Sequence, residues 1–168
     1  MALPVDYKRL NLLLKKLGLQ LEKLAIERDL PDKIKEQVQM EKKEKQFVFQ
    51  VAFSVIYEIS KHLIRRIYNK EIDDPWTAFQ FLSNEKIITF ECANGLLKLA
   101  SLDRDIKHYY WIEHYNQIDE LLKTCLKHME SFSSQIINFL MANPPETKNT
   151  QAIPLSYENL DEKEETID

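Results

Sequence analysis

Apolar side chains recur every three or four residues along most of this chain, and this spacing is the period of an α-helix. Between residues 7 and 28 the period is carried by leucines: Leu10, Leu13, Leu14, Leu17, Leu21 and Leu24. It predicts an amphipathic helix that Pro31 interrupts. The same period predicts a long central helix over residues 47–69 and a last helix over 116–142, which Pro144 and Pro145 end.

Capping residues mark the starts of the intervening helices. Asp74 can accept hydrogen bonds from free helical amides, and Pro75 at the first helical position lacks an N–H that would be unpaired. We therefore expect a short third helix over residues 75–82. Thr89 can cap a fourth helix that continues toward residues 106–110, and Asn116 can cap the fifth.

Glycine is scarce, since Gly18 and Gly95 are the only two in the chain. Hairpin-rich sheets need turns with positive φ, which glycine supplies most readily. The sequence therefore predicts an all-α fold, a bundle of about five helices around an antiparallel helix pair. No internal repeat interrupts this pattern.

Length and composition favour one soluble domain. The 168 residues are 44 % hydrophobic and include 8 Phe, 7 Tyr and 2 Trp, enough to bury a sizeable core. Cys92 and Cys125 have no Cys-x-x-Cys spacing, and the N-terminus lacks the pattern of a signal peptide. The longest nearly uncharged apolar run, residues 47–57, is shorter than the roughly 20 residues of a bilayer span. We expect a cytoplasmic protein with reduced thiols and no membrane segment.

The acidic residues are concentrated at the C-terminus. The formal net charge is −4, but residues 143–168 hold seven Asp or Glu and two Lys, which leaves 20 acids and 21 bases in residues 1–142. We expect a helical domain over 1–142 and a flexible acidic tail over 143–168. The alternative is that Tyr157 and the apolar segment 153–155 dock on a partner.

The four histidines do not form a metal site by spacing. His62, His108, His114 and His128 lie in different predicted elements, and none pairs with Cys or a carboxylate in a pattern specific for zinc. A structural or solvent-facing role is expected for His62, His114 and His128. The chain also lacks a glycine-rich phosphate loop and a nucleophile elbow. No metal or cofactor is predicted.

Residues 102–111, with the sequence LDRDIKHYYW, are the one dense cluster of functional side chains. An imidazole near neutrality can move the proton of a ribose 2′-hydroxyl, while an arginine stabilises charge on phosphate. At about 100° per residue, Arg104 and His108 are about 40° apart on one helical face. Tyr110 is about 160° from His108, so either the helix ends or two chains combine in the site. The alternative is a solvated helix end.

The chain resembles the HepT-like family of the HEPN superfamily over roughly residues 7–142. The resemblance rests on the helix order, on the segment QVAxxxIxxIxxHLI at residues 50–64, and on His108-x-Tyr110 before a long last helix. In that family a helical hairpin dimerises so that two Arg-x4-His-x-Tyr motifs face each other. The pair is proposed to act as a metal-independent ribonuclease toxin. The resemblance implies a homodimer here and an RNA substrate, with tRNA as one candidate.

Two of the three motif residues have a match in this sequence, and the third position holds a different residue. His108 and Tyr110 match the motif His and Tyr. The motif Arg, five positions before the His, falls on Asp103, and Arg104 stands beside it. Catalytic roles are therefore expected for His108, Tyr110, Arg104 and Asp103, with Arg104 in place of the motif arginine through its i,i+4 relation to His108.

The resemblance also implies a protein partner, a minimal nucleotidyltransferase (MNT) antitoxin that in some systems attaches AMP to the motif tyrosine. Tyr110 would be the acceptor, and each AMP would add charge and bulk where RNA must enter. A weaker expectation gives Lys61, Arg65, Arg66 and Lys107 a role in RNA binding; for the first three the alternative is a solvated helix end whose dipole favours cations.

Two other functions remain open from the sequence. One is an inactive binding module that only docks the nucleotidyltransferase and is modified by it, which Asp103 at the arginine position favours. The other is a helical scaffold without chemistry.

Overall fold

The structure is a computed structural model that describes residues 3–29, 31, 42–109 and 115–145. Within these residues it contains five α-helices and no β-strand: α1 (Tyr7–Asp29), α3 (Lys42–Tyr68), α4 (Pro75–Asn84), α5 (Phe90–Tyr109) and α6 (Tyr115–Ala142). The expected all-α fold is confirmed. The expected tail over 143–168 lies outside the described residues from residue 146 onward.

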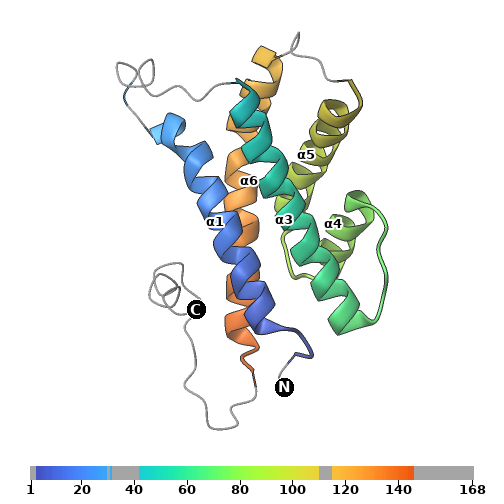
Figure 1. The fold of residues 1–168 in the computed structure, drawn as a ribbon. Coiled ribbons are helices and arrows are strands. Elements are labelled where there is room, and N and C mark those ends of the chain that lie inside the picture. Colours follow the sequence, from blue (N-terminus) through green and yellow to red (C-terminus); the bar gives the residue numbers. More distant parts are fainter. Residues whose placement is uncertain (1–2, 30, 32–41, 110–114, 146–168) are drawn as a thin grey trace, which may run out of the picture.

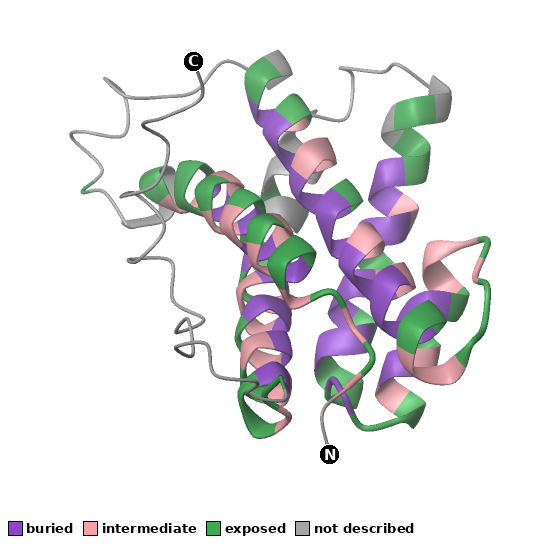
Figure 2. Ribbon diagram, turned by 60° about the horizontal axis from the view of Figure 1, so that its bottom comes forward, coloured by how far each residue is buried: buried purple, intermediate pink, exposed green. Residues whose placement is uncertain are grey.

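The long helices lie side by side and alternate in direction (Figure 1). α1 packs on α3 and α6, α5 packs on α6 and α4, and α3 touches α4, α5 and α6. Buried residues lie on the sides that the helices turn toward one another, and exposed residues lie outward (Figure 2). α3 contributes the largest share of the core, including Phe49, Ile56, Ile59, Leu63 and Ile64, all at 0 % exposure.

α3 begins at Lys42, five residues before the predicted start at residue 47. Its first residues are Lys, Glu and Gln, which favour a helix but add little to a hydrophobic period. The stretch Glu44–Tyr68 is long and apolar enough to cross a membrane, since an 18-residue window within it has a mean hydropathy of 1.3, but 61 % of that window is buried inside the bundle. Such burial is typical of the core helix of a globular bundle.

The predicted caps of α4 and α5 are present. Asp74 Oδ1 accepts the Thr77 backbone N–H at 2.8 Å, and its Oδ2 accepts the Thr77 hydroxyl at 2.7 Å. These hydrogen bonds lower the pKa of the Asp74 carboxyl. Thr89 Oγ1 accepts the Cys92 N–H at 3.2 Å at the start of α5. α6 begins at Tyr115, so Asn116 lies inside the first turn and the prediction that Asn116 caps this helix is wrong.

Two helices end in residues with positive φ although neither is glycine. Asn69 follows α3 with φ 53°, and its N–H donates to the Arg65 carbonyl at 3.0 Å. Lys86 follows α4 with φ 59°, and the next residue, Ile87, donates to the Leu82 carbonyl at 2.9 Å. A left-handed residue of this kind satisfies the last carbonyls of a helix and turns the chain back. The turn after α4 brings α5 against the bundle.

Candidate active site

The cluster singled out in the sequence lies at the C-terminal end of α5. Asp103, Arg104 and Lys107 are in its last two turns, and His108 is the penultimate residue of the helix. Because Arg104 and His108 are both helical, their Cα atoms are separated by about 6 Å of rise on nearly the same face. The side chain of His108 and all of Tyr110 lie outside the described residues. Their predicted catalytic roles remain predictions.

Asp103, at the position expected for the motif arginine, points into the protein and is only 5 % exposed. Its Oδ2 atom lies 2.8 Å from Lys107 Nζ, one helical turn later. Its Oδ1 atom is buried without a hydrogen-bond partner among the described residues. Lys107 therefore compensates the charge of the Asp103 carboxylate. The carboxylate also points away from the solvent side of the helix, which is the side from which a phosphate would approach.

Arg104, the next residue, points outward, and 57 % of its side chain is exposed. The guanidinium carbon lies 5.4 Å from the centroid of the Trp76 ring, a cation–π contact. Its Nε atom is 3.8 Å from Asp105 Oδ1, at the outer limit of an ion pair. A cation–π contact orients the guanidinium over the ring face without using its N–H groups, so they can still donate to an anion.

Trp76 is the residue of this site that the sequence did not reveal. It lies in the first turn of α4, which the Asp74 cap anchors, and α4 packs on α5. A contact between residues so far apart in sequence depends on how the two helices pack, and hydrophobic period alone does not give that. The available signal was an aromatic residue directly after the Asp-Pro helix start.

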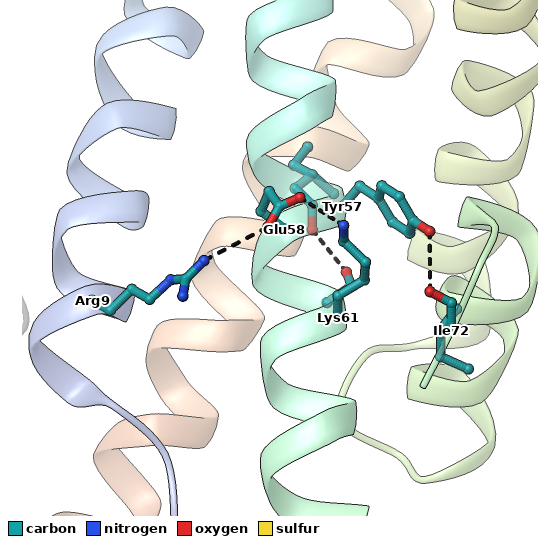
Figure 3. A network of polar contacts seen from close by, with 7 residues as sticks. Arg9, Tyr57, Glu58, Lys61 and Ile72 are labelled. Carbon is teal, nitrogen blue, oxygen red and sulfur yellow. Dashed lines mark hydrogen bonds and ion pairs between the residues drawn. The ribbon is translucent and has the colours of Figure 1, made fainter. Parts of the chain in front are cut away.

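Lys61, Arg65 and Arg66 form a second basic cluster, late in α3, whose charges are partly used within the protein. Lys61 Nζ lies 2.7 Å from Glu58 Oε1 and 4.5 Å from the centroid of the Tyr57 ring. Arg9 reaches the same carboxylate, with 3.8 Å between Nη2 and Oε2, so Glu58 links α1 to α3 (Figure 3). Arg65 Nε lies 2.9 Å from Glu71 Oε1.

This second cluster is far from Arg104 within one chain. α3 and α5 run in opposite directions, so the C-terminal end of α3 and the C-terminal end of α5 are at opposite ends of the bundle (Figure 1). One chain therefore does not bring Lys61, Arg65 and Arg66 together with Lys107 in a single RNA-binding surface.

His62 and His128 have structural surroundings. His62 is 8 % exposed, and its Nε2 accepts the backbone N–H of Asp6 at 3.1 Å. Burial lowers the pKa of His62, and the charges of Arg9 and Arg66 add to this effect. Burial also lowers the pKa of His128, whose ring packs on Gly95. Both imidazoles are thus held neutral near pH 7, and neither lies in the cluster on α5; His114 lies outside the described residues.

The thiols and carboxylates of the described residues offer no other evident chemistry. Cys92 and Cys125 are free and buried, and burial raises the pKa of the Cys92 thiol to about 11, which keeps it protonated. Among the described residues there is no group of three or more His, Cys, Asp or Glu side chains placed to hold a metal ion.

An open cavity of about 690 Å³ lies elsewhere, where the α4–α5 connection meets α6. Its lining includes Lys86, Thr89, Phe90, Gln135 and Asn138. Gln135 Oε1 accepts the Thr89 N–H at 2.7 Å, so one free amide of the α5 N-terminus is already satisfied there. This cavity is at the end of α5 opposite to Arg104 and is separate from the candidate site.

Comparison with known proteins supports the fold. No protein-family profile matches the sequence, and no curated protein matches it. Among solved structures, the chain is similar to YutE from Bacillus subtilis, described as a cytosolic protein of unknown function. The TM-score is 0.68 at 18 % sequence identity, and the alignment covers 83 % of this chain and 94 % of YutE. At this identity the likeness shows a shared helical fold.

Proposed function

We propose that this protein is a HepT-like toxin of the HEPN superfamily, a metal-independent endoribonuclease of a toxin–antitoxin module in the cytoplasm. The observation that carries the proposal is the arrangement of Asp103 and Arg104. The carboxylate at the motif arginine position is buried and paired with Lys107, while Arg104 is exposed over Trp76 one turn before His108. An exposed cation therefore lies one helical turn before the position of His108.

The proposed chemistry is cleavage of the RNA chain by attack of a ribose 2′-oxygen on the phosphorus of the adjacent phosphodiester. The bond from the 2′-oxygen to phosphorus forms as the bond to the 5′-oxygen breaks, and His108 accepts the proton of the 2′-hydroxyl and delivers it to the departing 5′-oxygen. Arg104 stabilises the negative charge that gathers on the phosphate oxygens. Asp103 does not touch the substrate in this proposal. Its part is to pair with Lys107 at the end of the helix. In a homodimer, two such helix ends would face one RNA strand.

RNA cleavage tests this assignment. Purified protein is incubated with total RNA or tRNA in the presence of EDTA, and His108→Ala serves as the matched control. General acid–base catalysis is worth about 10²–10⁴-fold in rate, so the variant is expected to lose activity by that factor. Equal cleavage by both proteins would point to a contaminant and refute the assignment.

A second candidate function is a binding module that has lost catalysis but still serves as the target of a nucleotidyltransferase. The buried Asp103 favours it, because the motif arginine is missing from its usual position. In both functions Tyr110 is the proposed acceptor of AMP from an MNT antitoxin. Added phosphate groups would repel an RNA backbone from the site.

Intact mass after coexpression with the nucleotidyltransferase tests the modification. The wild type is expected to gain AMP-sized increments, and Tyr110→Phe is expected to gain none. An unmodified wild type would contradict the proposed partner, whereas modification without RNA cleavage would favour the binding module over the ribonuclease.

A further inference from the structure

α1 carries apolar side chains on the side turned away from the bundle. Leu12, Leu19 and Ile26 are 58 %, 49 % and 47 % exposed, although five other leucines of this helix are buried in the core. The three are seven residues apart, so they lie within about 40° of one another on the helix. Their row is opposite to the buried row: Leu10, Leu14, Leu17, Leu21 and Leu24. Apolar side chains that share one outer surface make it a candidate docking surface, and the charges beside them decide what it fits.

Exposed lysines flank this row. Lys8, Lys16 and Lys23 are all exposed, and at about 100° per residue each lies within about 40° of Leu12 around the helix. Among the described side chains of α1, the exposed acid is Glu22, which is about 80° away. These three lysines, together with Leu12, Leu19 and Ile26, form the α1 outer face. A complementary partner would combine apolar and acidic side chains.

The C-terminal tail begins beside this helix. The hydroxyl of Tyr7, in the first turn of α1, donates to the carbonyl of Asn143, the residue after α6. The 25 residues from Pro144 to Asp168 can extend about 80 Å, whereas the 23 residues of α1 span about 35 Å. The tail can therefore reach every part of the α1 outer face.

The composition of the tail fits that face. Residues 146–168 contain seven acids and two lysines, and Ile153, Leu155, Tyr157, Leu160 and Ile167 are interspersed among them. We propose that residues 153–168 bind the α1 outer face of the same chain, with the apolar side chains on the leucine row and the acids beside the lysines. This inference is independent of the proposed ribonuclease activity.

The tail fits better than a second copy of α1. Pairing two identical outer faces would bring lysines near lysines, and like charges at close range oppose association. An attached segment also has an effective concentration of about millimolar or more, so even weak contacts are occupied. The bound tail would cover a basic, apolar surface that would otherwise attract polyanions, and it would be released at high ionic strength.

Methyl NMR of the full chain with a spin label in the tail tests the proposal. The label is placed at Asn159→Cys, since the two native thiols are buried. The methyl signals of Leu12, Leu19 and Ile26 are expected to lose most of their intensity, while those of Leu97 on α5 are retained. The loss should shrink as salt rises from about 0.05 M to about 0.5 M. Lys16→Glu with Lys23→Glu should abolish it, and adding Glu164→Lys with Glu165→Lys should restore it.

Three results would overturn the proposal. One is full intensity of the α1 methyl signals in the labelled wild type. Another is the same signal loss in the Lys16→Glu, Lys23→Glu variant, whose substitutions are at exposed positions and leave the core intact. The third is the same signal loss in a mixture in which the spin label and the isotope label are on different molecules, because the tail would then bind a neighbouring copy.

Discussion

Asp103 and Arg104 are adjacent in sequence, yet the first is buried and the second is exposed. A step of one residue rotates a side chain by about 100° around a helix, so adjacent positions face different surroundings. The inward position holds a carboxylate that Lys107 compensates, and the outward position holds a guanidinium that Trp76 orients. The cation of this pair is thus on the solvent side of α5.

His62 gives the stability of the protein a dependence on pH. Its pKa is lowered in the folded state, so the fold favours the neutral imidazole that accepts the Asp6 N–H. This stabilisation is complete above the unfolded pKa of about 6.5 and is lost as pH falls through that value toward the folded pKa. We expect the free energy of unfolding to decrease between pH 7 and pH 5.

Urea unfolding of His62→Gln measures this contribution. A glutamine oxygen can accept the Asp6 N–H but does not titrate, so the variant should lose less stability on acidification than the wild type. Some dependence should remain, because the pKa of His128 is lowered as well. Identical pH profiles for the two proteins would rule out His62 as a titrating group.

At the scale of the elements, Gly95 determines how closely α5 approaches α6. A Cβ atom added at Gly95 would lie 2.1 Å from Cγ of His128. Helix propensity alone predicts that Gly95→Ala stabilises α5 by about 1 kcal/mol. Because the ring must move, we expect the opposite, a destabilisation of about 1–3 kcal/mol.

A double-mutant cycle of chemical unfolding checks the cause. His128→Ala removes the ring, so Gly95→Ala should cost far less stability in that background. A stabilising effect of Gly95→Ala in the wild-type background would show that the two helices have room for the methyl group.

The sequence predicted those elements whose signals are local. The Asp74 and Thr89 caps and the leucine period of α1 are encoded within a few residues, and the structure confirms them. The start of α3 was missed because its first turn is polar. The Trp76–Arg104 contact and the packing of Gly95 on His128 were missed because each depends on how two helices approach. Of the candidate site, Arg104, Asp103 and Lys107 have described positions, and the roles of His108 and Tyr110 remain predictions.

At the scale of the whole molecule, the two basic regions are at opposite ends of one bundle (Figure 1). The cluster late in α3 is engaged with Glu58 and Glu71, whereas Arg104 is bound to its own chain mainly through an aromatic ring. Of the two regions, the α5 end is therefore the better candidate for the proposed phosphate contact. Arg104 and Lys107 can therefore be compared directly by mutation. Both are cations at the end of α5, but Lys107 pairs with a buried carboxylate, whereas Arg104 lies over the Trp76 ring.

The proposed role of Arg104 is tested by the rate of RNA cleavage by Arg104→Ala and Lys107→Ala, compared under single-turnover conditions in EDTA. We expect a loss of about 10²-fold or more for Arg104→Ala, since this substitution removes the group proposed to stabilise the phosphate charge. We expect a much smaller loss for Lys107→Ala, because the Lys107 charge is paired with Asp103. Equal losses for the two variants, or cleavage unaffected by Arg104→Ala, would refute the proposed role of Arg104.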